Sequence, residues 1–242
     1  MTTELVLLGL FSTMTSLLTA VAGLGGGMLL LALMAQLFPP AVLIPLHGVA
    51  QFFSNANRGW IHRAKLEWAY LKPFILGSAI GALAFVPLVV FVNPKIGALA
   101  IGLFILVVTW FPHWLKVSRL HPFFSGGLIS GLGVLFGATG PLAMSAHPKD
   151  NWNKEQIVGN HGAAMAFQHG AKVVAYLVAG VALYKYLPHI VVLFFGAWLG
   201  TFMGTQLLKK FTDDRFKIIL KWVLTALAIR LIVLNGYELL TT

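Results

Sequence analysis

Long apolar stretches alternate with short polar breaks along the whole chain. Charged residues, prolines and asparagines divide it into segments at residues 4–37, 41–57, 70–92, 95–111, 122–147, 157–182, 187–208 and 217–236. About 20 apolar residues are enough for an α-helix to cross the hydrocarbon core of a bilayer. The pattern therefore predicts an all-α, polytopic membrane protein, with four segments in each half.

Two stretches of the chain match each other at a constant shift. Residues 23–58 align with residues 137–172 without a gap, at a separation of 114 residues. The matched pairs are Gly23 with Gly137, Gly26 with Gly140, His47 with His161, Gly48 with Gly162, Ala50 with Ala164, Phe53 with Phe167, and Arg58 with Lys172. Duplicated halves with glycine-broken apolar segments are typical of transporters and point to the binding site. We expect an N-terminal repeat over residues 1–119 and a C-terminal repeat over residues 120–242.

The third and seventh segments share a further glycine pattern. Gly77 and Gly81 lie four residues apart, as do Gly196 and Gly200. Small residues at this spacing let helix backbones approach closely in lipid. We expect tight helix packing at both places.

Composition strengthens the membrane assignment. Apolar residues make up 58% of the chain and charged residues only 10%, and the mean hydropathy is +0.85, values that a soluble domain of this length does not reach. The chain has no cysteine, which excludes disulfides and Cys-ligated metals, and we expect no metal or cofactor. The net charge of +10 fits basic cytoplasmic loops rather than a nucleic-acid partner.

The placement of basic residues favours inverted repeats. If all eight segments crossed the membrane, the basic loops at 58–72 and 209–217 would lie on opposite sides, against the positive-inside rule. The conflict disappears if the first and fifth segments each enter and leave by one face, as a re-entrant hairpin or as two short crossings. One face then collects Arg58, Arg63, Lys65, Lys72, Lys116, Arg119, Lys149, Lys154, Lys209, Lys210, Arg215, Lys217 and Lys221, and the other keeps Lys95 and Lys185.

The glycine-rich breaks are candidate ligand sites. Glycine costs about 1 kcal/mol relative to alanine inside a helix, so Gly25, Gly26 and Gly27 interrupt the first segment, as Gly137 and Gly140 interrupt the fifth. A half-helix starting after each break, at Met28 and near Leu142, presents backbone N–H groups and a positive dipole end to an anion. The alternative is close helix packing through small residues.

Polar residues within the second and sixth segments extend this candidate site. Gln51, Asn55 and Arg58 have a spacing that places them on one helical face, and we expect the same of His161, Gln168 and Lys172. Arg58 has a second interpretation, as an anchor that snorkels to the basic face. Histidine changes charge near neutral pH, which makes His47, His161 and His169 candidates for proton coupling. The predicted substrate-binding set is Gly25, Gly26, Gly27, His47, Gln51, Asn55, Arg58, Thr139, Gly140, His161, Gln168 and Lys172.

The acidic residues all lie at segment ends or in loops. They are Glu4, Glu67, Asp150, Glu155, Asp213, Asp214 and Glu238. Cation transport ordinarily uses carboxylates within the membrane, so the pattern favours an anion as the substrate. An intramembrane hydrolase that uses Ser130 or Ser145 with His161 is an alternative, but no acidic residue lies near to complete a triad.

The chain resembles the sulfite exporter TauE/SafE family, also called the toluene sulfonate uptake permease family. The resemblance covers nearly the whole chain and rests on Ala22 to Leu29, on Arg58 to Trp68 leading into Pro73 to Gly81, and on the glycine-centred repeat in the second half. It implies a secondary transporter for small sulfur-containing anions such as sulfite, sulfoacetate or other organosulfonates. Thr139 and Pro141 replace the glycines of the first half and leave the particular anion open.

These observations predict a secondary active anion transporter that works by alternating access. The expected partners are the small anion, the lipid bilayer of a bacterial inner membrane, and protons as the coupling ion. An anion channel, or a subunit that works with a soluble partner, uses the same residue types and stays open.

Overall fold

The computed structural model describes residues 2–22, 25–90, 92–115, 117, 120–147, 152–207 and 214–241, and within these ranges all regular structure is helical. This confirms the all-α class. The first half holds α1 (Thr2–Ala22), α2 (Gly26–Met34), α3 (Pro40–Ile61), α4 (Trp68–Val90) and α5 (Pro94–Trp110). The second half holds α6 (Pro122–Phe136), α7 (Gly140–Ala146), α8 (Lys154–Val178), α9 (Leu187–Leu207) and α10 (Asp214–Leu240). Short 3-10 turns cover Arg63–Lys65, Pro112–Leu115 and Leu183–Tyr186.

The predicted first and fifth segments are each two helices. Gly25, at φ 98°, precedes α2, and Gly137, at φ 89°, ends α6. Only glycine adopts such a backbone at little cost, which explains a break at both places. The second helix of each pair begins at Gly26 or Gly140, two residues before the predicted starts. At about 1.5 Å per residue, α2 and α7 are too short to cross a bilayer.

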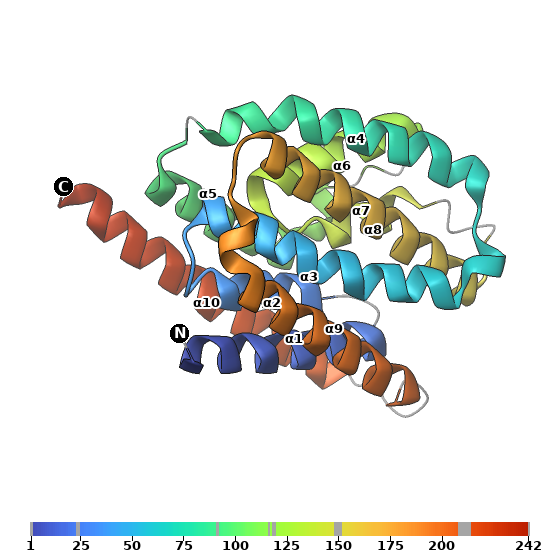
Figure 1. Cartoon of the computed structure of the whole chain (residues 1–242), viewed down its shortest axis with the longest axis horizontal. Helices are drawn as coiled ribbons and strands as arrows, with labels where there is room; N and C mark the ends of the chain where they lie inside the picture. Colours follow the sequence, from blue (N-terminus) through green and yellow to red (C-terminus); the bar gives the residue numbers. More distant parts are fainter. Residues whose placement is uncertain are drawn as a thin grey trace.

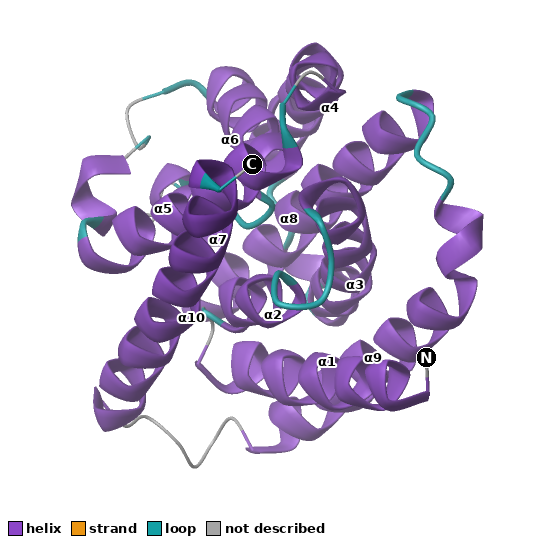
Figure 2. Ribbon diagram, turned by 90° about the vertical axis from the view of Figure 1, so that its left-hand side faces the viewer, coloured by secondary structure: helices purple, strands orange, loops and turns teal. Residues whose placement is uncertain are grey.

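Four helix pairs make the closest contacts, and each joins one half of the chain to the other. They are α4 with α6, α1 with α9, α3 with α8, and α5 with α10. In Figures 1 and 2, α3 and α8 lie between the α4–α6 pair and the α1–α9 pair. Each helix has a counterpart in the other half: α1 with α6, α3 with α8, α4 with α9, and α5 with α10. If every helix is replaced by its counterpart, the same four pairs result. The pattern agrees with a duplication, while the division at residue 119 and the inverted relation of the halves stay predictions.

The glycines of α4 and α9 lie at two of these contacts. A Cβ atom on Gly77 would stand 1.9 Å from the Phe123 carbonyl oxygen in α6, and one on Gly200 would stand 2.1 Å from the Thr13 carbonyl oxygen in α1. Real side chains do not tolerate such distances, so only glycine permits these helix separations. The predicted close packing is confirmed for both glycine patterns.

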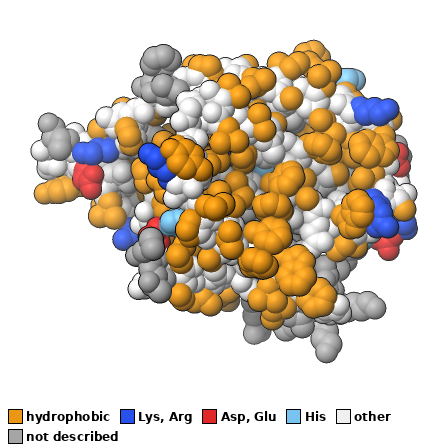
Figure 3. Space-filling model, in the orientation of Figure 1, with side chains coloured by type: hydrophobic (Ala, Val, Ile, Leu, Met, Phe, Trp, Pro, Cys, Tyr) orange, Lys and Arg blue, Asp and Glu red, His pale blue; other side chains and the backbone are white. Residues whose placement is uncertain are grey.

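The outer helices carry the surface suited to lipid. Among the described residues, four stretches are long and apolar enough to cross a membrane: Thr3–Val21, Trp68–Val89, Leu183–Gly204 and Ile218–Leu240. Apolar side chains cover the middle of the face in Figure 3, and charged ones lie toward its two ends. The long helices α3 and α8 are not among the candidate spans, because they carry the polar residues of the interior. The chain is an integral membrane protein.

Charged residues of the described ranges form ion pairs at both ends of α4, and the collection of basic residues on one face stays a prediction. Lys65 pairs with Glu155 at one end. At the other end of α4, Lys95 lies 3.7 Å from Glu238, and His189 lies 3.3 Å from Glu4. We call the end that contains Lys65 the basic end. Other predicted members of that face, together with Gly23 of the first break, lie outside the described residues: Lys116, Arg119, Lys149, Lys209 and Lys210.

Candidate functional site

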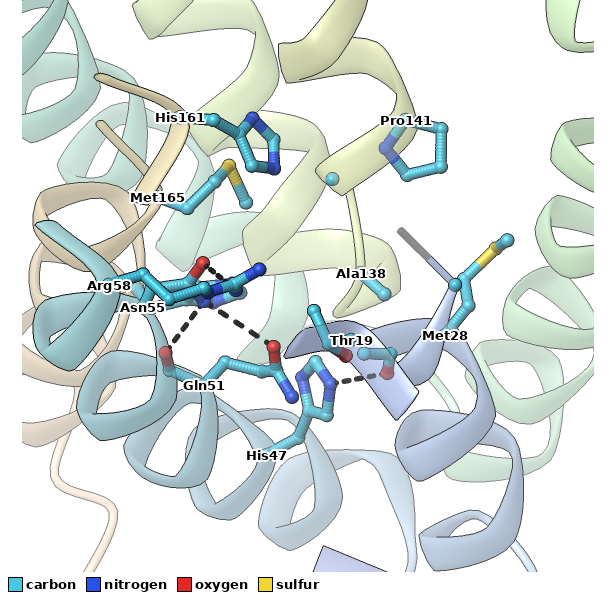
Figure 4. Close-up of a pocket in the computed structure, with 14 residues that line it drawn as sticks. Thr19, Met28, His47, Gln51, Asn55, Arg58, Ala138, Pro141, His161 and Met165 are labelled. Atoms are coloured by element: carbon cyan, nitrogen blue, oxygen red, sulfur yellow. Dashed lines mark hydrogen bonds between the residues drawn. The ribbon is translucent and has the colours of Figure 1, made fainter. Parts of the chain in front are cut away.

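A pocket of about 40 Å³ lies where α3, α8 and both helix breaks meet (Figure 4). Nine predicted residues line it: Gly25, Gly27, His47, Gln51, Asn55, Arg58, Gly140, His161 and His169. None of the residues that line it carries a carboxylate. A water molecule needs roughly 10–15 Å³ on this scale, so the pocket suits a ligand of only a few non-hydrogen atoms.

Three side chains of α3 form a polar ladder along the pocket. Arg58 Nη2 donates to Asn55 Oδ1 at 2.6 Å, and Asn55 Nδ2 donates to the Gln51 carbonyl oxygen at 2.7 Å. Spacings of three and four residues place all three on one face of the helix, as predicted. Figure 4 shows Gln51, Asn55 and Arg58 from α3 on the side of the pocket that faces His161 and Met165.

Arg58 supplies a positive charge to this pocket. Its side chain is only 7% exposed, and within the described ranges its Nε atom has no hydrogen-bond partner. The ion pairs formed by described residues lie elsewhere and do not include it. The interpretation of Arg58 as an anchor that snorkels to water is therefore wrong. A buried guanidinium with an N–H group to donate is suited to a bound oxyanion.

His47 ties α3 to the first break. Its Nε2 lies 2.8 Å from the Gly27 carbonyl oxygen, which can only accept, so Nε2 carries the hydrogen. The His169 ring packs edge-on against His47, with ring centroids 5.8 Å apart. The Nδ1 atoms of both rings are buried and have no partner among the described residues. His47 Nδ1 becomes a donor to an anion only when the ring is protonated, because Nε2 already carries the hydrogen of the neutral ring. His169 Nδ1 can also donate in the neutral tautomer that carries its hydrogen there.

Both breaks contribute backbone to the pocket. Gly25 and Gly27 come from the first break, and Ala138 and Gly140 from the second. A Cβ atom on Gly27 would lie 2.9 Å from Gln51 Oε1, so the glycine lets the backbone approach the ladder on α3. The breaks meet at the pocket, as the sequence predicts.

The structure places four predicted residues outside the pocket wall. They are Gly26, Thr139, Gln168 and Lys172. A Cβ atom on Gly26 would stand 2.0 Å from the Thr15 carbonyl oxygen, so this glycine serves the packing of α1 on α2, the alternative considered above. Thr139 is fully buried beside the second break, and its hydroxyl has no partner among the described residues.

Gln168 and Lys172 turn toward α6 rather than the pocket. The pocket-facing residues of α8 are His161, Met165 and His169, which follow one another at steps of four. Lys172 is fully buried, and its Nζ donates to the Gly137 carbonyl oxygen at 2.7 Å. The prediction that Gln168 and Lys172 line the site together with His161 was wrong for this pocket, because their polar ends lie against α6 and the residue that ends it.

Five lining residues were not predicted. They are Thr19, Met28, Ala138, Pro141 and Met165. Met165 matches Gln51 at the shift that relates the two halves, which is a signal that the sequence offers for it. Thr19 lies near the end of α1, and its hydroxyl donates to the Thr15 carbonyl oxygen at 2.8 Å; nothing in its sequence context marks it.

Comparison with known proteins assigns the family. Residues 7–231 match the sequence profile of the family described as "Sulfite exporter TauE/SafE". No curated protein and no solved structure matches the chain. The profile covers nearly the whole of the helical bundle and both breaks. The chain belongs to the sulfite exporter TauE/SafE family and is a membrane transporter.

Proposed function

We propose that this protein carries a small sulfur oxyanion of the sulfite or sulfonate type across a bacterial inner membrane by alternating access. The observation that carries the proposal is Arg58, a buried cation whose pocket has no carboxylate on its wall. An anion in the pocket would supply the missing negative charge and accept a hydrogen bond from Nε. The family description, which names sulfite, supports the same class of substrate.

The pocket would hold the anion from three sides. Arg58 and Asn55 would contact it from α3, His161 and His169 from α8, and the backbone of Gly27 from the first break. The size of the pocket favours an ion such as sulfite or methanesulfonate over an aromatic sulfonate. Alternating access would require the helices around α3 and α8 to move so that the pocket opens to each side in turn.

Counterflow in liposomes tests this function. Purified protein is reconstituted with unlabelled sulfite or methanesulfonate inside, and we expect labelled anion to accumulate transiently against its gradient, which a channel does not produce. Absence of saturable exchange with either anion contradicts the transport proposal. Flux without counterflow contradicts alternating access and favours a channel.

Arg58→Gln provides the matched mutation. We expect it to abolish binding and exchange, while the thermal stability of the unliganded protein is not lowered, since the variant no longer buries an uncompensated charge. Arg63→Gln is the control, because Arg63 is exposed at the basic end and packs over the Trp60 ring. Retained exchange in Arg58→Gln rules out this arginine as the anion ligand.

A further inference from the structure

Three buried side chains from separate parts of the sequence form a continuous hydrogen-bonded chain. Tyr70 Oη lies 3.0 Å from His147 Nδ1, and His147 Nε2 lies 3.0 Å from His161 Nδ1. Tyr70 belongs to α4, His147 follows α7, and His161 belongs to α8. Both ring nitrogens of His147 therefore take part, so its ring can receive a proton on one side and release one on the other.

The chain leads from the basic end to the pocket. Tyr70 lies in the first turn of α4, five residues after Lys65, and His161 lines the pocket. Trp152 packs edge-on against the Tyr70 ring at 5.2 Å and lies 5.6 Å from the His147 ring. Phe74 stacks on Tyr70, with ring centroids 5.7 Å apart. These rings hold the three hydrogen-bonding groups in line and shield them from water.

We infer that Tyr70, His147 and His161 form a proton path between the basic end and the anion pocket, so that a proton travels with the anion. The inference rests on the proposed anion transport and identifies its coupling ion. Among these residues only His161 has an expected proton role from the sequence. Tyr70 and His147 supply the hydrogen-bonded link to the basic end that a proton-carrying histidine within the membrane requires.

Proton movement along the path balances at each atom. His161 Nδ1 accepts the proton of His147 Nε2, and the His161 ring, which keeps its Nε2–H, becomes an imidazolium beside the anion. His147 Nδ1 then accepts the Tyr70 hydroxyl proton, and a proton from the basic end restores the hydroxyl. The net result is one proton held on His161 in the pocket, after which the two hydrogen bonds of the path run in the opposite direction. His161 Nε2–H releases this proton when the pocket opens to the other side. Rotation of the imidazole rings and the hydroxyl restores the original direction.

Charged groups around the path favour proton uptake together with the anion. Arg58 and His47 face the pocket from α3, as His169 does from α8, and the Lys172 ammonium lies one turn further along α8. An anion entering among these groups adds negative charge beside His161 and so favours a proton on its ring. Nearer the surface, Lys65 pairs with Glu155, and the Glu67 carboxylate accepts from Gln156 Nε2 at 2.9 Å. These carboxylates offer a place for protons to enter.

The test separates exchange from coupling. Methanesulfonate is the probe, because it remains ionised over the working range and cannot carry the proton itself. In wild-type liposomes we expect exchange at equal pH and also accumulation driven by an imposed pH gradient. In Tyr70→Phe and His147→Gln we expect exchange to persist and pH-driven accumulation to be lost. The matched controls His113→Gln and Tyr184→Phe change exposed residues and should keep both activities.

Each outcome bears on a different claim. Wild-type protein that exchanges the anion but ignores the pH gradient overturns the proton path and leaves the transport proposal intact. Retention of pH-driven accumulation in His147→Gln also overturns the path. Absence of wild-type exchange with methanesulfonate and with sulfite contradicts the transport function itself. Loss of accumulation with retained exchange in both variants supports the path, since a purely structural role would reduce the two activities together.

Discussion

Arg58 and Lys172 occupy matched positions in the two halves but have different surroundings. Arg58 lies on the pocket wall with Asn55 as its hydrogen-bond partner, whereas Lys172 donates to the Gly137 carbonyl oxygen at the end of α6. A pair that began as equal copies would thus serve two purposes. Arg58 faces the pocket, and Lys172 satisfies a backbone carbonyl group that the second helix break exposes.

This difference predicts the behaviour of Lys172→Met. The substitution removes the donor to the buried Gly137 carbonyl oxygen, and leaving such a group unsatisfied costs about 1–3 kcal/mol. We expect a lower thermal midpoint in detergent and a much smaller loss of sulfite affinity than Arg58→Gln causes. Lys185→Met, at an exposed lysine, is the control. Loss of affinity equal to that of Arg58→Gln, with unchanged stability, would place Lys172 among the anion ligands after all.

At the scale of the element, glycine decides how closely helices approach. Gly77 and Gly127 face each other where α4 crosses α6, but their tolerance differs. A Cβ atom on Gly77 would collide with backbone, whereas one on Gly127 has its nearest neighbour at 3.4 Å, an ordinary contact. At this crossing, Gly77 therefore excludes any side chain, whereas Gly127 can accommodate a methyl group.

We expect Gly77→Ala to destabilise the protein and Gly127→Ala to have little effect. Overpacking of this kind typically costs 1–3 kcal/mol or more, while the gain in helix propensity is the same for both substitutions. Thermal unfolding of the two purified variants in one detergent provides the comparison. Equal midpoints would show that α4 and α6 can separate without cost at this crossing.

Much of this element-level order follows from the sequence. Hydropathy located the helices, and glycine marked both breaks, because these features depend on local chemistry. The contacts of Gln168 and Lys172 with α6 were not predictable, since they depend on how α6 packs against α8. His147 and Tyr70 were missed for a related reason, because they are neighbours of His161 only after α4, α7 and α8 come together.

At the scale of the whole molecule, the two halves interlock. Each of the four closest helix pairs takes one member from residues 1–119 and one from residues 120–242. The core of the bundle is thus shared between the halves rather than contained within each. The polar helices α3 and α8 are buried against each other, so neither half buries its own polar helix, although each half contains the corresponding helices.

We predict that neither half folds alone and that the two associate when produced together. Separate expression of residues 1–119 and 120–242 should give aggregated or degraded protein, because α3 lacks α8 and α1 lacks α9. Co-expression with a tag on one half should recover both halves and restore counterflow of the anion. A single half that purifies as a monodisperse, protease-resistant species would argue against interlocking.

The polar character of α3 and α8 has a consequence for how the chain is made. During synthesis α3 leaves the ribosome about a hundred residues ahead of α8, and polar and charged side chains are costly in a membrane until they find partners. The side of α3 that holds Gln51, Asn55 and Arg58 thus has no matching surface until α8 arrives. Closure of the pocket is then among the last steps of assembly. A chain stalled before that step leaves this side of α3 exposed to any assembly factor that accompanies it.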